Sequence, residues 1–119
     1  MVEEQPKLKI RQQENLRVVE FEDRKILEEQ AINQIGKRLA GLAEETPKPK
    51  LLLDFKNVQH LSSSALGMLI TLNKQLMERE GRLVLANIHP QIYEVFKITK
   101  LNKLFNIQST TEDAMAALG

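Results

Sequence analysis

The stretch Leu51–Gly67 is the part of the sequence that most constrains the fold. It opens with the almost unbroken apolar run Leu51–Phe55. A run of this kind is typical of a strand covered on both faces, as in a parallel sheet with helices packed on it. A short polar loop follows, and then three serines, Ser62–Ser64, precede a long apolar helix. The stretch therefore predicts a buried strand, a loop and a hydroxyl-rich helix N-terminus, where backbone N–H groups are unpaired and a phosphate is favoured.

Composition and charge limit the classes of function that the chain can have. Its 119 residues suffice for a single domain, 1–119, in which residues 1–6 are expected to form a disordered terminus. A formal net charge of +1 does not indicate a nucleic acid or an anionic membrane as partner, and the absence of cysteine excludes disulfides and thiol chemistry. The first residues do not form a secretory signal, and no apolar run approaches the roughly 20 residues of a membrane helix. We therefore expect a cytoplasmic protein that binds neither nucleic acid nor membrane.

Two strands and one helix are expected before the central strand. Apolar and polar residues alternate over 7–12, and a second strand is expected over 17–22, which predicts a hairpin with a turn at 14–15. Apolar residues then recur at helical spacing within 25–43, and Asp23 stands at the expected N-cap position.

The second half of the chain alternates helices with strands. A helix is expected from the serines at 62–64 to about Glu80, with Gly81 as its C′ residue, and a strand follows over 82–86. The next helix is expected from Pro90 to about Ile98, followed by a strand over 104–107. A capping box at 109–112 precedes a last helix over 113–118. The order β-β-α-β-α-β-α-β-α indicates an α/β fold. Because right-handed crossovers in one direction place their helices together, we expect a mixed sheet with helices mainly on one face.

The residues Leu51–Phe55, Val58 and Leu61–Gly67 resemble the signature of the STAS domain family, the anti-sigma factor antagonists. In that family an apolar strand and a loop lead to Asp-Ser-Ser/Thr-Gly-Leu-Gly at the start of a helix. The resemblance continues at 81–87, 95–101 and 104–105. It covers nearly the whole chain in the same element order, and it implies a STAS-like fold.

The resemblance also implies a regulatory protein that works by binding other proteins, as a monomer or weak dimer. Family members are phosphorylated by a partner serine kinase on the first serine of the pair, which is Ser63 here; Ser62 and Ser64 are weaker candidates. The unphosphorylated form binds this kinase, which is also an anti-sigma factor, and so frees a sigma factor. A serine phosphatase completes the implied partners. The chain departs from the pattern twice: Ser62 replaces the family aspartate and brings no charge, and Ala65 replaces a glycine and adds a methyl group where the family leaves space for a partner.

Three other interpretations of the serines stay open. Their hydroxyls could serve only to cap the helix. The chain could be a STAS scaffold or assembly subunit that is not phosphorylated. It could also bind a small ligand or anion in a crevice near Ser63, Asp23 and His89.

The second helix offers a candidate docking surface. With residues placed about 100° apart, one stripe faces the sheet and an apolar flank lies beside it, on the side of Ser63. The stripe is formed by Ala65, Leu69, Leu72 and Leu76, and the flank by Leu66, Ile70 and Met77. The flank either packs on a neighbouring helix, which is the commoner case, or leaves part of Leu66 or Ile70 exposed as an anchor for a partner. In related antagonists the loop after the second strand also contacts the kinase. The expected partner-binding residues are therefore Asp23, Arg24, Ser62, Ser63, Ser64, Ala65, Leu66 and Ile70.

Enzymatic function is not expected. A serine hydrolase would use Ser63 with His60, but the sequence has no nucleophile elbow, no assigned oxyanion hole and no orienting acid. Two histidines without a carboxylate at ligand spacing make a poor zinc site, and no phosphate-binding Gly-x-x-x-x-Gly-Lys loop is present. We therefore predict no catalytic residue, no metal and no cofactor.

Overall fold

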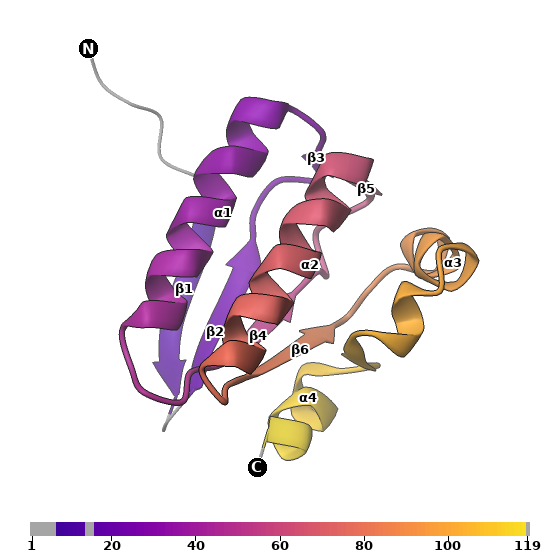
Figure 1. Ribbon diagram of the computed structural model, residues 1–119. Coiled ribbons are helices and arrows are strands. Elements are labelled where there is room, and N and C mark those ends of the chain that lie inside the picture. The colour runs from indigo at the N-terminus through magenta and orange to yellow at the C-terminus, as the bar shows by residue number, and fades with distance from the viewer. Residues whose placement is uncertain (1–6, 14–15, 119) are drawn as a thin grey trace.

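The computed structural model describes residues 7–13 and 16–118, which form a mixed α/β fold around one main sheet (Figure 1). The sheet has five strands in the order β1-β2-β4-β6-β7. Their bounds are β1 Leu8–Gln13, β2 Leu16–Phe21, β4 Lys50–Asp54, β6 Arg82–Ala86 and β7 Asn106–Gln108. β1 pairs antiparallel with β2, and the other neighbours pair in parallel. The predicted hairpin and mixed sheet are confirmed; the turn at 14–15 and the terminus 1–6 lie outside the described residues.

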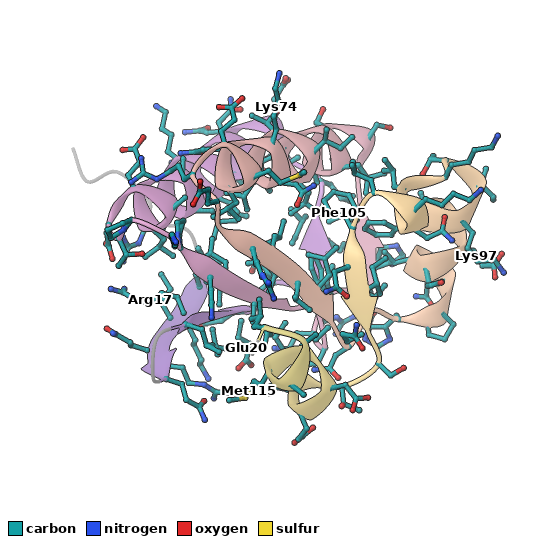
Figure 2. All side chains as sticks on the ribbon, turned by 60° about the horizontal axis from the view of Figure 1, so that its bottom comes forward. Arg17, Glu20, Lys74, Lys97, Phe105 and Met115 are labelled. Atoms are coloured by element: carbon teal, nitrogen blue, oxygen red, sulfur yellow. The ribbon has the colours of Figure 1, made fainter. Side chains whose placement is uncertain are left out.

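Two long helices cover one face of this sheet, and a short helix covers the other. The helices are α1 Glu29–Glu44, α2 Ser63–Glu78, α3 Pro90–Ile98 and α4 Thr111–Leu118, with a 3₁₀ turn η1 at Leu101–Lys103. Figure 1 shows α1 and α2 side by side across the sheet, and Figure 2 shows α4 on the opposite face. α3 lies beyond β6, at the edge of the molecule (Figure 1). The expectation of helices mainly on one face is confirmed.

The central strand β4 is buried on both faces, as its apolar run predicts. Leu51 and Leu53 belong to the core beneath α1 and α2, whereas Leu52 belongs to the smaller core beneath α4. All three side chains are fully buried. Because successive residues of a strand point to opposite faces, a strand covered by helices on both sides needs apolar residues at every position.

The start of α1 differs from the prediction. The helix begins at Glu29, its N-cap is Glu28, and Lys25–Ile26 form a short strand, β3, which pairs in parallel with β5 at His60–Leu61. Asp23 therefore does not cap the helix. The reason is a tertiary one, because pairing with β5 holds these residues in an extended conformation that a local cap signal does not reveal.

The end of α2 also differs from the prediction in one respect. The left-handed residue after the helix is Glu80, with φ of 58°, and not Gly81. The N–H of Gly81 donates to Leu76 O at 2.7 Å and the N–H of Glu80 to Met77 O at 3.0 Å, which is the bond pattern of a Schellman motif. Gly81 is needed for a different reason, since a Cβ there would lie 2.3 Å from the carbonyl oxygen of Pro49.

The last strand and the last helix begin slightly away from their predicted positions. Lys100 adopts a left-handed conformation and starts the 3₁₀ turn, so Leu104 lies outside the strand and is exposed, and β7 begins at Asn106. Phe105, between the turn and the strand, packs edge-on against Phe96 of α3 with ring centroids 5.7 Å apart. At α4 the capping hydroxyl belongs to Thr110, whose Oγ1 accepts a hydrogen bond from Asp113 N at 3.1 Å, one residue later than the predicted capping box.

Candidate functional site

The first turn of α2 assigns different roles to its serines. Ser62 has extended backbone angles (φ −83°, ψ 167°), and its Oγ accepts a hydrogen bond from Ala65 N at 3.2 Å. Its carbonyl oxygen accepts a second bond from Leu66 N at 3.1 Å. Ser62 is therefore the N-cap of the helix, and its hydroxyl is engaged in that role.

Ser63 and Ser64 are exposed at the surface. Their hydroxyls and backbone N–H groups form no hydrogen bond with any residue of 7–13 or 16–118. The first turn of α2 contains no acidic residue. The site therefore presents, at the positive end of a helix dipole, two hydroxyls and neighbouring N–H donors that no described residue engages.

The two serines face different sides of α2. At about 100° per residue, Ser63 lies about 60° from Leu66 around the helix axis, whereas Ser64 lies about 160° from it. Leu66 is buried against the core at the edge of α2 that faces α3. Ser63 is therefore the serine on the α3 side of the helix.

A groove of about 340 Å³ opens between α2 and α3 on this side of the helix. It is lined by Gln59, His60, Leu61, Leu66, Gln91, Ile92 and Val95. The Val95 side chain is exposed, whereas Leu66 and Ile92 are buried at its floor. This α2–α3 groove offers a partner a small apolar seat, and Ser63 lies three residues, about one turn of α2, before the lining residue Leu66. None of the three residues near which a crevice was expected, Ser63, Asp23 and His89, lines the groove.

The pairing of β3 with β5 brings the loop after β2 to the start of α2. The carbonyl oxygen of Arg24 accepts hydrogen bonds from Gln59 N at 2.7 Å and from His60 N at 3.0 Å. The N–H of Ser62 donates to Ile26 O at 3.1 Å. Arg24 is exposed, and Asp23 lies 3.9 Å from Lys7 in an exposed ion pair. Asp23 and Arg24 thus share an edge of the molecule with the serine loop, as expected.

A buried carboxylate supports the loop that carries the serines. Asp54 at the end of β4 accepts hydrogen bonds from Lys56 N at 3.0 Å and from Asn87 Nδ2 at 2.9 Å. Asn87 Nδ2 also donates to Thr111 Oγ1 at 3.0 Å, which ties α4 to the same carboxylate. Asp54 is almost fully buried, and a buried carboxylate left without such partners would be costly.

Two further contacts hold the same loop in place. Asn57 Nδ2 donates to Glu20 Oε1 and to Phe21 O, both at 3.1 Å. A ring nitrogen of His89, Nε2, lies 2.7 Å from the carbonyl oxygen of Lys56. The prediction missed these supporting residues, although one signal was present, because Asp54 is the single charge within the apolar run. His89 holds the loop, and no hydrogen bond between Ser63 and His60 occurs within the described residues.

The flank of α2 is divided between two environments. Leu66 is 8% exposed, whereas Ile70 is 38% and Met77 is 65% exposed. Packing against neighbouring elements, the commoner of the two cases, is therefore correct for Leu66 and wrong for Ile70 and Met77. Ala65 is fully buried, so its methyl group points to the core and does not occupy the docking surface.

No helix within residues 7–13 and 16–118 combines the length and the apolar character needed to cross a bilayer. In the same ranges, no group of three or more metal-ligating side chains of His, Cys, Asp or Glu comes together.

Comparison with known proteins identifies a matching family and a related sequence. The model of the STAS domain matches residues 7–114 of the chain. The chain is 32% identical over 84 residues to BtrV of Bordetella bronchiseptica, provisionally named an anti-sigma factor antagonist; the alignment covers 71% of this chain and 72% of that protein.

Two solved structures share the fold. An anti-sigma-factor antagonist (STAS) domain protein from Planctomyces limnophilus superposes with a TM-score of 0.83 at 21% identity, covering 94% of this chain and 97% of that one. The Bacillus cell fate determinant SpoIIAA, in its phosphorylated form, superposes with a TM-score of 0.70 at 18% identity, covering 94% and 99%.

Proposed function

Because the chain belongs to the STAS domain family, we propose that it is an anti-sigma factor antagonist controlled by phosphorylation of Ser63. The partner is an anti-sigma factor with serine-kinase activity, which binds the unphosphorylated form and transfers phosphate to Ser63. A serine phosphatase restores the binding form. The main observation behind this proposal is that neighbouring serines at the start of α2 have different roles. Ser62 caps the helix, while the Ser63 hydroxyl is exposed and forms no hydrogen bond with any described residue.

Position on the helix favours Ser63 over its two neighbours. The Ser62 hydroxyl already accepts the capping bond and the residue is only half-exposed, so it is less available to a kinase than Ser63. Ser64 is exposed but faces away from the α2–α3 groove. A partner side chain seated on Leu66 and Val95 would lie next to Ser63, so a phosphate there would be sensed most directly by that partner.

A phosphate at Ser63 should change the surface of the domain and not its fold. It would add about −1.5 to −2 charges at pH 7. The N-terminal end of a helix stabilises a negative charge by about 0.3–2 kcal/mol, and no acidic side chain in the first turn of α2 opposes it. The effect must therefore fall on the docked partner, through bulk, desolvation and like-charge repulsion.

The test combines intact-mass measurement with binding. Wild type and the Ser63→Ala and Ser64→Ala variants are each incubated with ATP and candidate anti-sigma serine kinases. We expect one added phosphate on wild type and on Ser64→Ala, and none on Ser63→Ala. Ser63→Asp should bind the same kinase about tenfold or more weakly than wild type.

Three outcomes would contradict the proposal. Phosphorylation of Ser63→Ala would move the switch to another residue. A kinase that binds wild type without phosphorylating it would favour the non-phosphorylated scaffold. Backbone amide shifts that spread from Ser63→Asp far beyond the α2 N-terminus would refute a surface switch in favour of a change of fold.

A further inference from the structure

We propose that the domain has a second docking surface, separate from the Ser63 loop, which binds an acidic amphipathic helix of a partner protein. This α2–η1 groove has a volume of about 450 Å³. It is lined by Ile70, Asn73, Lys74, Met77, Glu78 and Leu104. It shares no lining residue with the α2–α3 groove.

The apolar residues of this groove are spaced to receive a helix. Ile70 and Met77 lie two turns apart on the outer side of α2, and Leu104 faces them from the segment that follows η1. Their exposed fractions are 38%, 65% and 47%, so three large apolar side chains meet solvent in one place. A groove with such anchors is the form in which proteins bind the apolar face of an amphipathic helix.

Asn73 adds a polar group to the groove. Its side chain is 8% exposed, and its Nδ2 donates to Met77 Sδ at 3.7 Å. A thioether sulfur is a weak acceptor, and buried amides usually have a stronger partner. A carboxylate or backbone carbonyl of a docked helix could replace the sulfur, which would fix the register of that helix in the groove.

The charge around the groove selects an acidic occupant. Lys74 and Glu78 both line the groove, so their charges offset each other; Lys97, Lys100 and Lys103 lie on the segment that leads to Leu104, and the excess of positive charge comes from that segment. Lys97 pairs with Glu94 at 3.5 Å, whereas the other three form no ion pair with any described residue. Figure 2 shows Lys74 projecting outward from α2.

The same lysines argue against a second copy of the chain as the occupant. A two-fold dimer through this groove would bring the lysines of both copies to one interface. Like charges placed across an interface oppose association, while a partner rich in Glu or Asp gains from the same field.

The experiment selects the occupant without assuming its sequence. A displayed library of amphipathic helices of about 18 residues, five turns, carries apolar residues at i, i+3, i+4 and i+7 and equal shares of Glu, Lys and Ser elsewhere. It is selected on wild type after depletion on the Met77→Glu variant. We expect acidic helices to be enriched, and the enriched peptide to shift the amides of Ile70, Met77 and Leu104.

Variants make the result specific. Met77→Glu should weaken the selected peptide about tenfold or more, and Lys100→Glu combined with Lys103→Glu should turn the preference toward lysine-rich helices. Ser63→Asp should leave the affinity unchanged, so failure of the Ser63 switch and failure of this surface give different results. Enrichment without acidic preference, shifts elsewhere on the domain, or a peptide-free dimer that Met77→Glu dissociates would each overturn the proposal.

Discussion

Replacing Ser62 with alanine should destabilise the protein by about 1 kcal/mol, whereas Ser63→Ala should change stability by less than about 0.5 kcal/mol. The Ser62 hydroxyl accepts the hydrogen bond of Ala65 N, and alanine would leave that N–H without its capping partner. The Ser63 hydroxyl is exposed and bonds to no described residue. Each of the two substitutions removes one side-chain hydroxyl oxygen, so the difference in stability between the variants measures the effect of the cap.

Urea unfolding followed by circular dichroism at 222 nm measures the difference. With a slope of about 1–3 kcal/mol/M, a loss of about 1 kcal/mol lowers the urea midpoint by about 0.3–1 M for Ser62→Ala. Ser63→Ala should unfold close to the wild-type midpoint. Ser62→Gly is a matched control, because glycine at an N-cap costs only a few tenths of a kcal/mol.

The same pair separates structure from regulation. Ser62→Ala should retain phosphorylation at Ser63, since the modified hydroxyl stays exposed. Equal destabilisation by Ser62→Ala and Ser63→Ala would refute the conclusion that Ser62 alone caps the helix. So would a Ser62→Ala protein as stable as wild type, because the helix would then not depend on this cap.

Three further predictions concern the scaffold. Gly81→Ala should destabilise the protein by about 1–3 kcal/mol, since the added Cβ would lie 2.3 Å from the carbonyl oxygen of Pro49. Gly41→Ala should stabilise it by about 0.5–1 kcal/mol, because a Cβ at this position of α1 meets nothing within 4 Å. Thermal unfolding of both variants measures the two changes in stability. Leu53→Ala should lose about 2–5 kcal/mol in urea unfolding, because the side chain is fully buried in the central strand. Asp54→Ala should lower the free energy of unfolding by about 1–3 kcal/mol and broaden the amide signals of the loop before α2. Asp54→Asn keeps an acceptor oxygen and should lower it less. Equal losses of stability in the two variants would show that the hydrogen bonds of Asp54 do not support the loop.

The order of the elements and the central strand are encoded locally. A five-residue apolar run such as Leu51–Phe55, bounded by polar segments, is typical of a strand covered on both faces, and the structure places it there. The start of α2 is local as well, because an N-cap serine and the N–H three residues later are close in the chain. The exposure of Ser63 is local too. The cap fixes where α2 begins, and the apolar stripe faces the sheet, which leaves Ser63 on the solvent side of the helix.

Other features depend on residues far apart in the chain. Asp23 resembles an N-cap in the sequence, yet its segment is drawn into β3 by pairing with β5, which lies more than thirty residues later. Asp54 accepts a hydrogen bond from Asn87 only because β4 and β6 are neighbours in the sheet, and Asn87 also bonds to Thr111 only because α4 packs on the far face of these strands. Gly81 looks like a helix terminator, but its real constraint is the carbonyl oxygen of Pro49 from another loop.

By itself, the sequence determined the order of strands and helices, the burial of the central strand and the capped serine at the head of α2, because periodicity and capping act between residues a few positions apart. Only the tertiary structure decided which side of α2 stays open. Leu66 and Ile70 have the same apolar character in the same flank, yet the packing around α2 leaves the first buried and the second at the surface. The reason is that exposure is settled by what packs alongside a residue, and that neighbour is set by the path of the whole chain.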